Sequence, residues 1–181
     1  MKNMKPSARI ALCGMMAALS IVIMFLSGLI PSMTIALPAL AGCMLIPVTA
    51  ECGTKYGFTV FAAVAFLGFF LVADREAWLM FVLFFGYYPV LFGVLARIKK
   101  RGLCFAVKML IFTAACVAEG LISVYLLSIP MDEIGPFGRW SVLILLALAE
   151  VVFVIYDRCI GNLISLYFAR FRRLLNRLFR F

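Results

Sequence analysis

The chain has 181 residues, of which 66% are apolar and 14% charged, and its formal net charge at pH 7 is +9. A soluble domain of this length could not bury so much apolar surface, because the usual apolar fraction is about half. In lipid every backbone polar group needs an internal partner, and these long apolar runs lack the alternation of barrel strands. The composition therefore excludes a soluble globular domain and predicts an all-α polytopic membrane protein.

The apolar runs predict six membrane-spanning helices, since one span needs about 20 apolar residues. In chain order the predicted spans are 8–28, 33–50, 56–73, 77–96, 103–129 and 140–160. The first run is too long for the apolar part of a signal peptide, so we expect it to be retained. Pro38 and Pro47 lie within the second run, which is therefore predicted to be kinked or broken.

The basic residues lie at the ends of the apolar runs, which argues against nucleic-acid binding and predicts an orientation. With the N-terminus inside, 15 of the 17 basic residues, Lys108 among them, fall in inner segments. Only Arg75 and Arg139 fall in outer loops. The outer loops also hold four acidic residues: Asp74, Glu76, Asp132 and Glu133. Both termini are therefore predicted to be cytoplasmic, and we expect the protein in the inner membrane of a bacterial cell.

The C-terminal segment 169–181 is predicted to be separate from the six-helix transmembrane domain, residues 1–168. Apolar side chains recur there at helical spacing, and Arg170, Arg173, Arg177 and Arg180 fall on a different face. This pattern is typical of a basic amphipathic helix on the anionic inner leaflet of a membrane. A simple positive-inside anchor explains the segment as well as a partner-docking role does.

Two acidic residues lie near the middle of predicted spans, Glu119 in the fifth and Glu150 in the sixth. Ionisable groups at membrane depth are costly and often mark a ligand or ion site. The two spans are antiparallel, so the carboxyls are expected at similar depth, where one or both would be protonated or paired with a cation. We predict a substrate-binding site there, with Ser123 of the fifth span. Hydrogen bonding between neutral glutamic acids is the alternative.

The fourth predicted span carries an aromatic set that predicts the rest of this substrate-binding site. Trp78 lies near its outer end, where an aromatic-belt anchor is the simpler interpretation. Phe85 and Tyr88 lie deeper, beside Gly86 and Pro89, and could face a planar ligand. A kinked packing interface would explain the same residues.

No catalytic motif is present, so the protein is not expected to be an enzyme or to hold a cofactor. The chain has no histidine, and its six cysteines form no CxxC pair, which argues against a metal site. It also lacks a phosphate-binding GxxxxGK[ST] loop. Work driven by ATP would therefore need a partner.

The first predicted span carries small residues at Gly14 and Ala18, four positions apart, which lets two helices approach closely. A short basic N-terminus that opens into such a span, in a six-span chain with both ends inside, resembles the substrate-binding S components of energy-coupling factor (ECF) transporters. The resemblance is architectural over the whole chain. The family's alanine–three residues–alanine pattern appears here as the variant Gly14 to Ala18.

The resemblance implies an S-component-like fold and a function. The family captures vitamins and related micronutrients in a pocket near the outer side of the membrane. Gly14 and Ala18 would then dock a transmembrane coupling subunit that is joined to two cytoplasmic ATPases. The chain is similar in size and hydropathy to a second family, the small rod-shape-determining membrane proteins that act as envelope scaffolds. A scaffold would need no ligand, and Glu119 and Glu150 would then serve packing or partner contacts.

Overall fold

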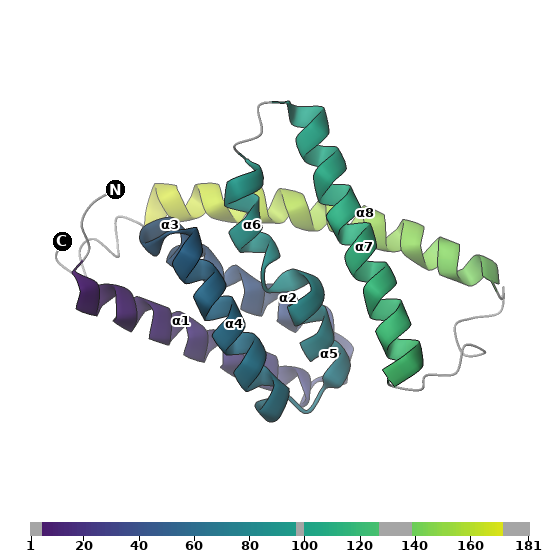
Figure 1. Ribbon diagram of the computed structural model, residues 1–181, viewed down its shortest axis with the longest axis horizontal. Coiled ribbons are helices and arrows are strands. Elements are labelled where there is room, and N and C mark those ends of the chain that lie inside the picture. Colours follow the sequence, from purple (N-terminus) through teal and green to yellow (C-terminus); the bar gives the residue numbers. More distant parts are fainter. Residues whose placement is uncertain (1–4, 97–99, 127–138, 172–181) are drawn as a thin grey trace. The chain divides into compact units, whose positions relative to one another are not determined.

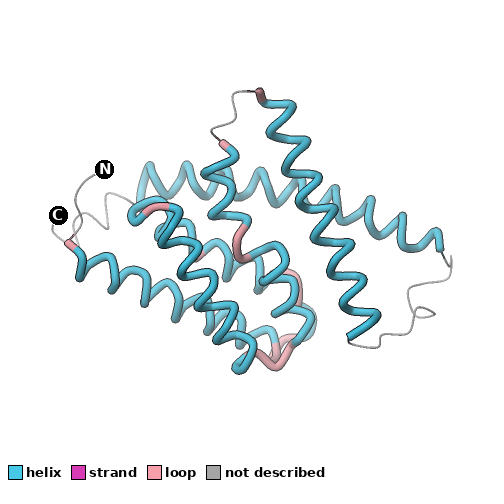
Figure 2. The backbone as a smooth tube through the Cα atoms, in the orientation of Figure 1, coloured by secondary structure: helices cyan, strands magenta, loops and turns pink. Residues whose placement is uncertain are grey.

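The computed structural model describes residues 5–96, 100–126 and 139–171 of the protein. Every regular element within these ranges is a helix, which confirms the all-α prediction for this part of the chain (Figures 1 and 2). In chain order the elements are α1 (Pro6–Ser27), η1 (Pro31–Met33), α2 (Ala36–Cys43), α3 (Leu45–Cys52), α4 (Thr54–Leu71), α5 (Arg75–Met80), η2 (Phe81–Phe85), α6 (Tyr88–Leu95), α7 (Arg101–Leu126), α8 (Arg139–Leu166) and η4 (Tyr167–Phe171).

The lengths and compositions of these helices indicate a membrane protein. Among the described residues, four helices are long and apolar enough to cross a membrane: Pro6–Ser27, Thr54–Leu71, Arg75–Leu95 and Gly102–Ser123. The apolar stretch Ala36–Cys52 is shorter. Helix α8 has 28 residues, and Glu150, Asp157 and Arg158 interrupt its apolar sequence. The six predicted spans thus correspond to six helical stretches, four of which are both long enough and apolar enough to cross a membrane.

The chain divides into two compact units, each described by itself. Unit 1 comprises Met1–Arg97 with Ile160–Phe181, and unit 2 comprises Ile98–Cys159. The predicted boundary between a transmembrane domain and a tail at residue 169 falls within η4, a short π-helix that continues directly from α8. Most of the predicted tail helix, residues 172–181, lies outside the described residues.

The core of unit 1 is formed where α1 packs against α2, α3 and α4. The buried residues of this core are Leu12, Met24, Ala41, Leu45, Val48, Cys52, Val60, Val64, Val72, Phe81 and Val90. One polar contact crosses the core: the buried Ser20 hydroxyl donates to the carbonyl oxygen of Ala41 at 3.0 Å. A hydroxyl buried among apolar helices needs such a partner, so this bond fixes how α1 lies on α2.

The second predicted span is broken, as its prolines indicated. α2 ends at Cys43 and α3 begins at Leu45, with Met44 between them. Pro47 has no backbone N–H, so the carbonyl four residues earlier cannot form its ordinary helical bond. The break therefore lies where the proline removes a hydrogen bond.

The fourth predicted span is also irregular, because its middle is a π-helix. Over Phe81–Phe85 the backbone hydrogen bonds join residues that are five positions apart. The backbone N–H of Gly86, for example, donates to the Phe81 carbonyl oxygen at 2.8 Å. The broken second span crosses the π-helix at Gly42. A Cβ atom on Gly42 would overlap the carbonyl oxygen of Phe85, so this crossing requires a residue without a side chain.

Unit 2 is built from α7 and the part of α8 that ends at Cys159, two helices that pack against each other (Figure 1). Phe112 of α7 and Phe153 of α8 are both buried and stack with their ring centroids 4.5 Å apart and their planes 11° apart. The antiparallel pairing expected for the last two spans is therefore present, with Phe112 opposite Phe153.

Candidate functional site

A row of polar and aromatic groups joins α7 to α8 in unit 2, and we call it the α7–α8 seam. Its members are Lys108, Phe112 and Thr113 of α7, with Glu150, Phe153 and Asp157 of α8. Spacings of three and four residues place Glu150, Phe153 and Asp157 on one face of α8, and Lys108 and Phe112 on one face of α7. Sequence spacing therefore explains every seam residue except Thr113, which follows Phe112 directly.

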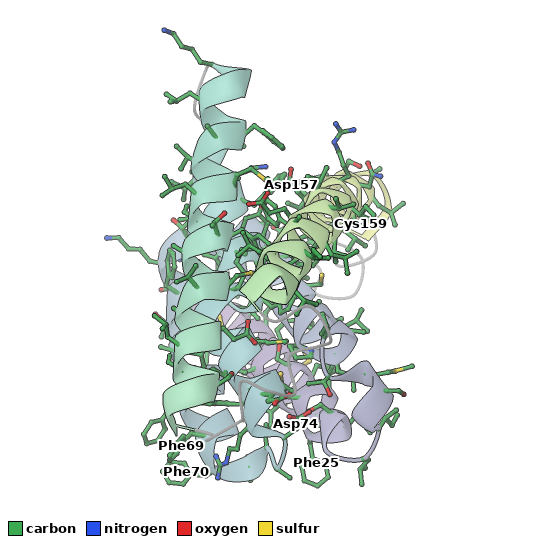
Figure 3. The ribbon with its side chains drawn as sticks, turned by 90° about the vertical axis from the view of Figure 1, so that its right-hand side faces the viewer. Phe25, Phe69, Phe70, Asp74, Asp157 and Cys159 are labelled. Atoms are coloured by element: carbon green, nitrogen blue, oxygen red, sulfur yellow. The ribbon has the colours of Figure 1, made fainter. Side chains whose placement is uncertain are left out.

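The first level of the seam is an ion pair. The Lys108 Nζ atom lies 2.6 Å from Asp157 Oδ1, and the two side chains are only 9% and 15% exposed. Figure 3 shows Asp157 at the junction of the two helices, whereas Cys159, two residues further, is exposed. Two charges taken out of water are tolerated only when they are paired closely and hydrogen-bonded.

The second polar level lies beyond the Phe112–Phe153 stack and joins Thr113 to Glu150. The Thr113 hydroxyl oxygen lies 2.9 Å from the carbonyl oxygen of Met109 and 3.1 Å from Glu150 Oε1. A hydroxyl has a single proton, so it donates to only one of these oxygens. Donation to Glu150 Oε1 joins α7 to α8, whereas donation to the Met109 carbonyl oxygen stays within α7.

Glu150 is half-buried beside Thr113. No cationic side chain among the described residues pairs with Glu150, because Lys108 is committed to Asp157. Glu150 is therefore the carboxyl of the seam that could meet a cationic or hydrogen-bond-donating group.

Glu119 and Ser123 lie further along α7, and both are half-buried. The thiol of Cys116 lies within electrostatic range of both Glu119 and Glu150. Glu119 of α7 and Glu150 of α8 thus both lie near Cys116. Ser123 is one helical turn beyond Glu119 on the same face of α7.

The predicted aromatic residues belong to unit 1, where Trp78 is packed on α4. Its indole N–H donates to the carbonyl oxygen of Ala65 at 2.9 Å, and its ring meets that of Phe69 edge-on at 5.3 Å. Gly68 leaves space for the indole ring, because a Cβ atom at position 68 would lie only 3.1 Å from it. Figure 3 places Phe69 and Phe70 together at one end of this unit, an arrangement that suits an interfacial aromatic anchor.

Phe85 and Tyr88 are also involved in packing within unit 1. Tyr88 is fully buried, and its ring lies 4.7 Å from that of Phe84. Phe85 is half-buried and meets Phe84 edge-on at 5.3 Å. These contacts support the packing interpretation of the aromatic set, while Glu119, Ser123 and Glu150 lie in the other unit.

The two residues predicted to dock a partner lie on the outward face of α1. Gly14 and Ala18 are both exposed, and a Cβ on Gly14 would meet nothing within 4 Å. The packing of unit 1 uses the other face, through Leu12, Ser20 and Met24. Both small residues are therefore accessible to lipid or to another helix.

No protein-family model, curated protein or solved structure matches this chain. Within the described ranges, no three or more Cys, Asp or Glu side chains are grouped so that they could hold a metal ion.

The sequence analysis missed five seam residues: the stacked pair Phe112 and Phe153, and the polar residues Lys108, Thr113 and Asp157. Lys108 was counted among the inner-segment charges, but it lies on α7 within the candidate span Gly102–Ser123. A usable signal was present, because Lys108 and Asp157 have opposite charges and lie near the inner ends of adjacent antiparallel spans. Thr113 offered no comparable signal, since a lone threonine in an apolar run has many uses.

Proposed function

We propose that this protein is a membrane-embedded substrate-capture subunit of an ATP-driven micronutrient importer, as its resemblance to S components implies. The observation that supports a ligand site is the Thr113–Glu150 contact, a carboxyl held at membrane depth without a cationic partner among the described residues. Such a group is costly to retain without a use. The proposal places the termini in the cytoplasm and the membrane as that of a bacterial cell.

The proposed ligand is a small molecule with a cationic or hydrogen-bond-donating group, bound through Glu150 and Glu119. Glu150 gives up its proton as that group enters, so no uncompensated charge arises in the seam. Ser123 adds a hydroxyl on the same face of α7. The exposed Gly14 and Ala18 face is the surface proposed to meet the coupling subunit, which hands the ligand on with energy from the partner ATPases.

Native mass spectrometry of protein gently extracted from its host membrane tests this proposal. The wild-type protein is expected to carry a bound small molecule, and Glu150→Gln is expected to lose it because a neutral amide cannot become the carboxylate that pairs with a cationic group. Glu76→Gln is the matched control, since Glu76 is an exposed glutamate of α5. At a thousandfold excess over Kd, a ligand stabilises the protein by about 4 kcal/mol.

Two results would contradict the proposal. One is a wild-type protein that carries no small molecule and gains no thermal stability from a small-molecule extract of its host cells. The other is a bound molecule whose amount is the same in wild type, Glu150→Gln and Glu119→Gln at equal membrane levels.

The second candidate function is an envelope scaffold like the small rod-shape-determining membrane proteins. The packing of Trp78 against Ala65 and Phe69 favours it, because it uses a predicted ligand residue within the fold. A scaffold is expected to co-purify with cell-wall enzymes and to carry no small molecule. The same native extraction therefore separates the two functions.

A further inference from the structure

One end of unit 1 presents exposed aromatic side chains from the last two turns of α4. Phe66, Phe69 and Phe70 are all exposed, and their spacings of three and four residues place them on one face of the helix. Phe66 and Phe69 each meet Phe70 edge-on, with ring centroids 5.4 and 5.2 Å apart. Figure 3 shows Phe25 of α1, also exposed, at the same end. In a membrane protein such an aromatic surface contacts lipid.

Arg75 lies on this aromatic surface instead of pairing with its acidic neighbours. Its Nη1 atom donates to the carbonyl oxygen of Phe69 at 2.6 Å, and its guanidinium carbon lies 5.2 Å from the centre of the Phe69 ring. Among the described residues, Arg75 forms no ion pair with Asp74 or Glu76. The Asp74 carboxylate instead accepts the backbone N–H of Ala77 at 3.1 Å. The positive charge is therefore held beside the exposed phenylalanines.

The bond to Phe69 explains why Arg75 lies here, but it uses only part of the guanidinium. Helix α4 ends at Leu71, and the carbonyl oxygens of a last helical turn have no partner within the helix. Arg75 satisfies one of them with one of its five N–H donors. Because Arg75 is exposed, its other donors can bind an anionic group outside the protein. The planar arrangement of these donors matches the oxygens of a phosphate group.

The charges next to Arg75 select the kind of phosphate-containing group that fits. Asp74 and Glu76 flank Arg75 in the sequence, so two negative charges surround one positive charge. The two carboxylates repel a headgroup with a net negative charge, whereas the ammonium of a zwitterionic headgroup is attracted to them while its phosphate meets Arg75. A free inorganic phosphate has no apolar part to contact the phenylalanines. A zwitterionic phospholipid therefore matches both the charges and the aromatic surface.

We propose that this end of unit 1 binds a zwitterionic phospholipid, with Arg75 at its phosphate. The acyl chains lie along Phe66, Phe69 and Phe70, whose exposed rings provide the apolar surface. In the predicted orientation this end of α4 lies at the outer leaflet of the membrane. The lipid site does not depend on the proposed transport function, because it rests on the apolar helices and on the contacts of Arg75.

Quenching of Trp78 fluorescence by brominated lipids tests this proposal. The Trp78 ring meets that of Phe69 edge-on at 5.3 Å, so bromine atoms near the glycerol end of a lipid bound there come close to the indole. The chain has two tryptophans, and Trp140→Phe leaves Trp78 as the single reporter. This protein is placed in nanodiscs of unlabelled phosphatidylcholine.

One of three brominated lipids with the same acyl chains is then added at the same mole fraction. Phosphatidylcholine is zwitterionic, phosphatidylglycerol is anionic, and diacylglycerol has no phosphate. Phosphatidylcholine is expected to quench Trp78 most strongly, with an affinity relative to diacylglycerol of about five-fold, the value typical of one arginine at a lipid headgroup. Arg75→Gln should remove this preference. Lys55→Gln is the control and should keep it, because the exposed Lys55 lies at the opposite end of α4.

Three results would overturn the proposal. Equal quenching by phosphatidylcholine and diacylglycerol would show that no phosphate is bound. Quenching by phosphatidylglycerol that equals or exceeds that by phosphatidylcholine would show that the site does not select a zwitterion. A preference that persists in Arg75→Gln, or that is also lost in Lys55→Gln, would show that Arg75 is not its source. The first two comparisons keep Arg75 intact, so they decide even if Arg75→Gln does not fold.

Discussion

Lys108 on α7 and Asp157 on α8 form an ion pair of 2.6 Å although both side chains are largely withdrawn from solvent. A pair of this kind adds little net stability over apolar residues, but removal of one partner leaves the other charge buried and uncompensated. The pair is therefore most informative when its two members are changed separately and together.

Lys108→Met is expected to destabilise the protein by about 3 kcal/mol, because Asp157 is then left unpaired. The double variant Lys108→Met with Asp157→Leu should recover most of the lost stability. Thermal unfolding in detergent measures both, and Lys55→Met serves as the control because Lys55 is exposed. A double variant no more stable than Lys108→Met would show that the pair has a role beyond charge compensation.

The proposed function requires Glu150 to carry a proton before the ligand enters, and this requirement can be tested by infrared spectroscopy. The wild-type protein should show the carbonyl stretch of a protonated carboxyl near neutral pH, and the difference spectrum against Glu150→Gln isolates it. Thr113→Val should shift this band, because Glu150 then loses its hydrogen bond with the Thr113 hydroxyl. The control is Thr59→Val, since the Thr59 hydroxyl donates only to the Lys55 carbonyl oxygen on an exposed face. A difference spectrum without a protonated-acid band would show Glu150 to be ionised.

Gly42→Ala is expected to destabilise unit 1 by about 2 kcal/mol or more, because the added methyl group overlaps the Phe85 carbonyl oxygen. Gly93→Ala is the matched control, since a Cβ at Gly93 meets nothing within 4 Å. In a helix, alanine at that position should be neutral or slightly stabilising. Unfolding midpoints of the two variants test this contrast. Equal midpoints would show that the α2–η2 crossing accommodates an added methyl group without loss of stability.

Gly14→Leu and Ala18→Leu are expected to leave the stability of the isolated protein within about 0.5 kcal/mol of wild type, since both sites are exposed. Under the proposed function they should abolish co-purification of the coupling subunit while ligand binding persists. Ile10→Leu is the control, an exposed residue of α1 outside the small-residue pair. Undiminished co-purification would remove this face from the proposed docking surface.

The sequence predicted the helices well because span length and loop charge act locally along the chain. The ends of α1, α4 and α7 lie within a few residues of the predicted spans, and the break in the second span follows from Pro47. The π-helix at Phe81–Phe85 was not predicted. A run of five apolar residues does not indicate that backbone hydrogen bonds will join residues five positions apart instead of four.

The candidate site was predicted less completely, since it depends on which residues face each other across two helices. Glu119 and Glu150 were found because a lone acid in an apolar run is conspicuous. Thr113 could be recognised as part of the site only from its distance to Glu150. The periodicity of the sequence does not predict that distance. Trp78 is the opposite case. It is conspicuous in the sequence, but its indole N–H donates to the carbonyl oxygen of Ala65 within the fold.

The Phe112–Phe153 stack separates the ion pair from the Thr113–Glu150 contact, and this order has a consequence for proton movement. A continuous file of polar groups and water between two helices conducts protons, whereas two closely stacked rings exclude the water that such a file needs. The stack therefore interrupts any continuous polar path along the seam between the Lys108–Asp157 pair and Glu150.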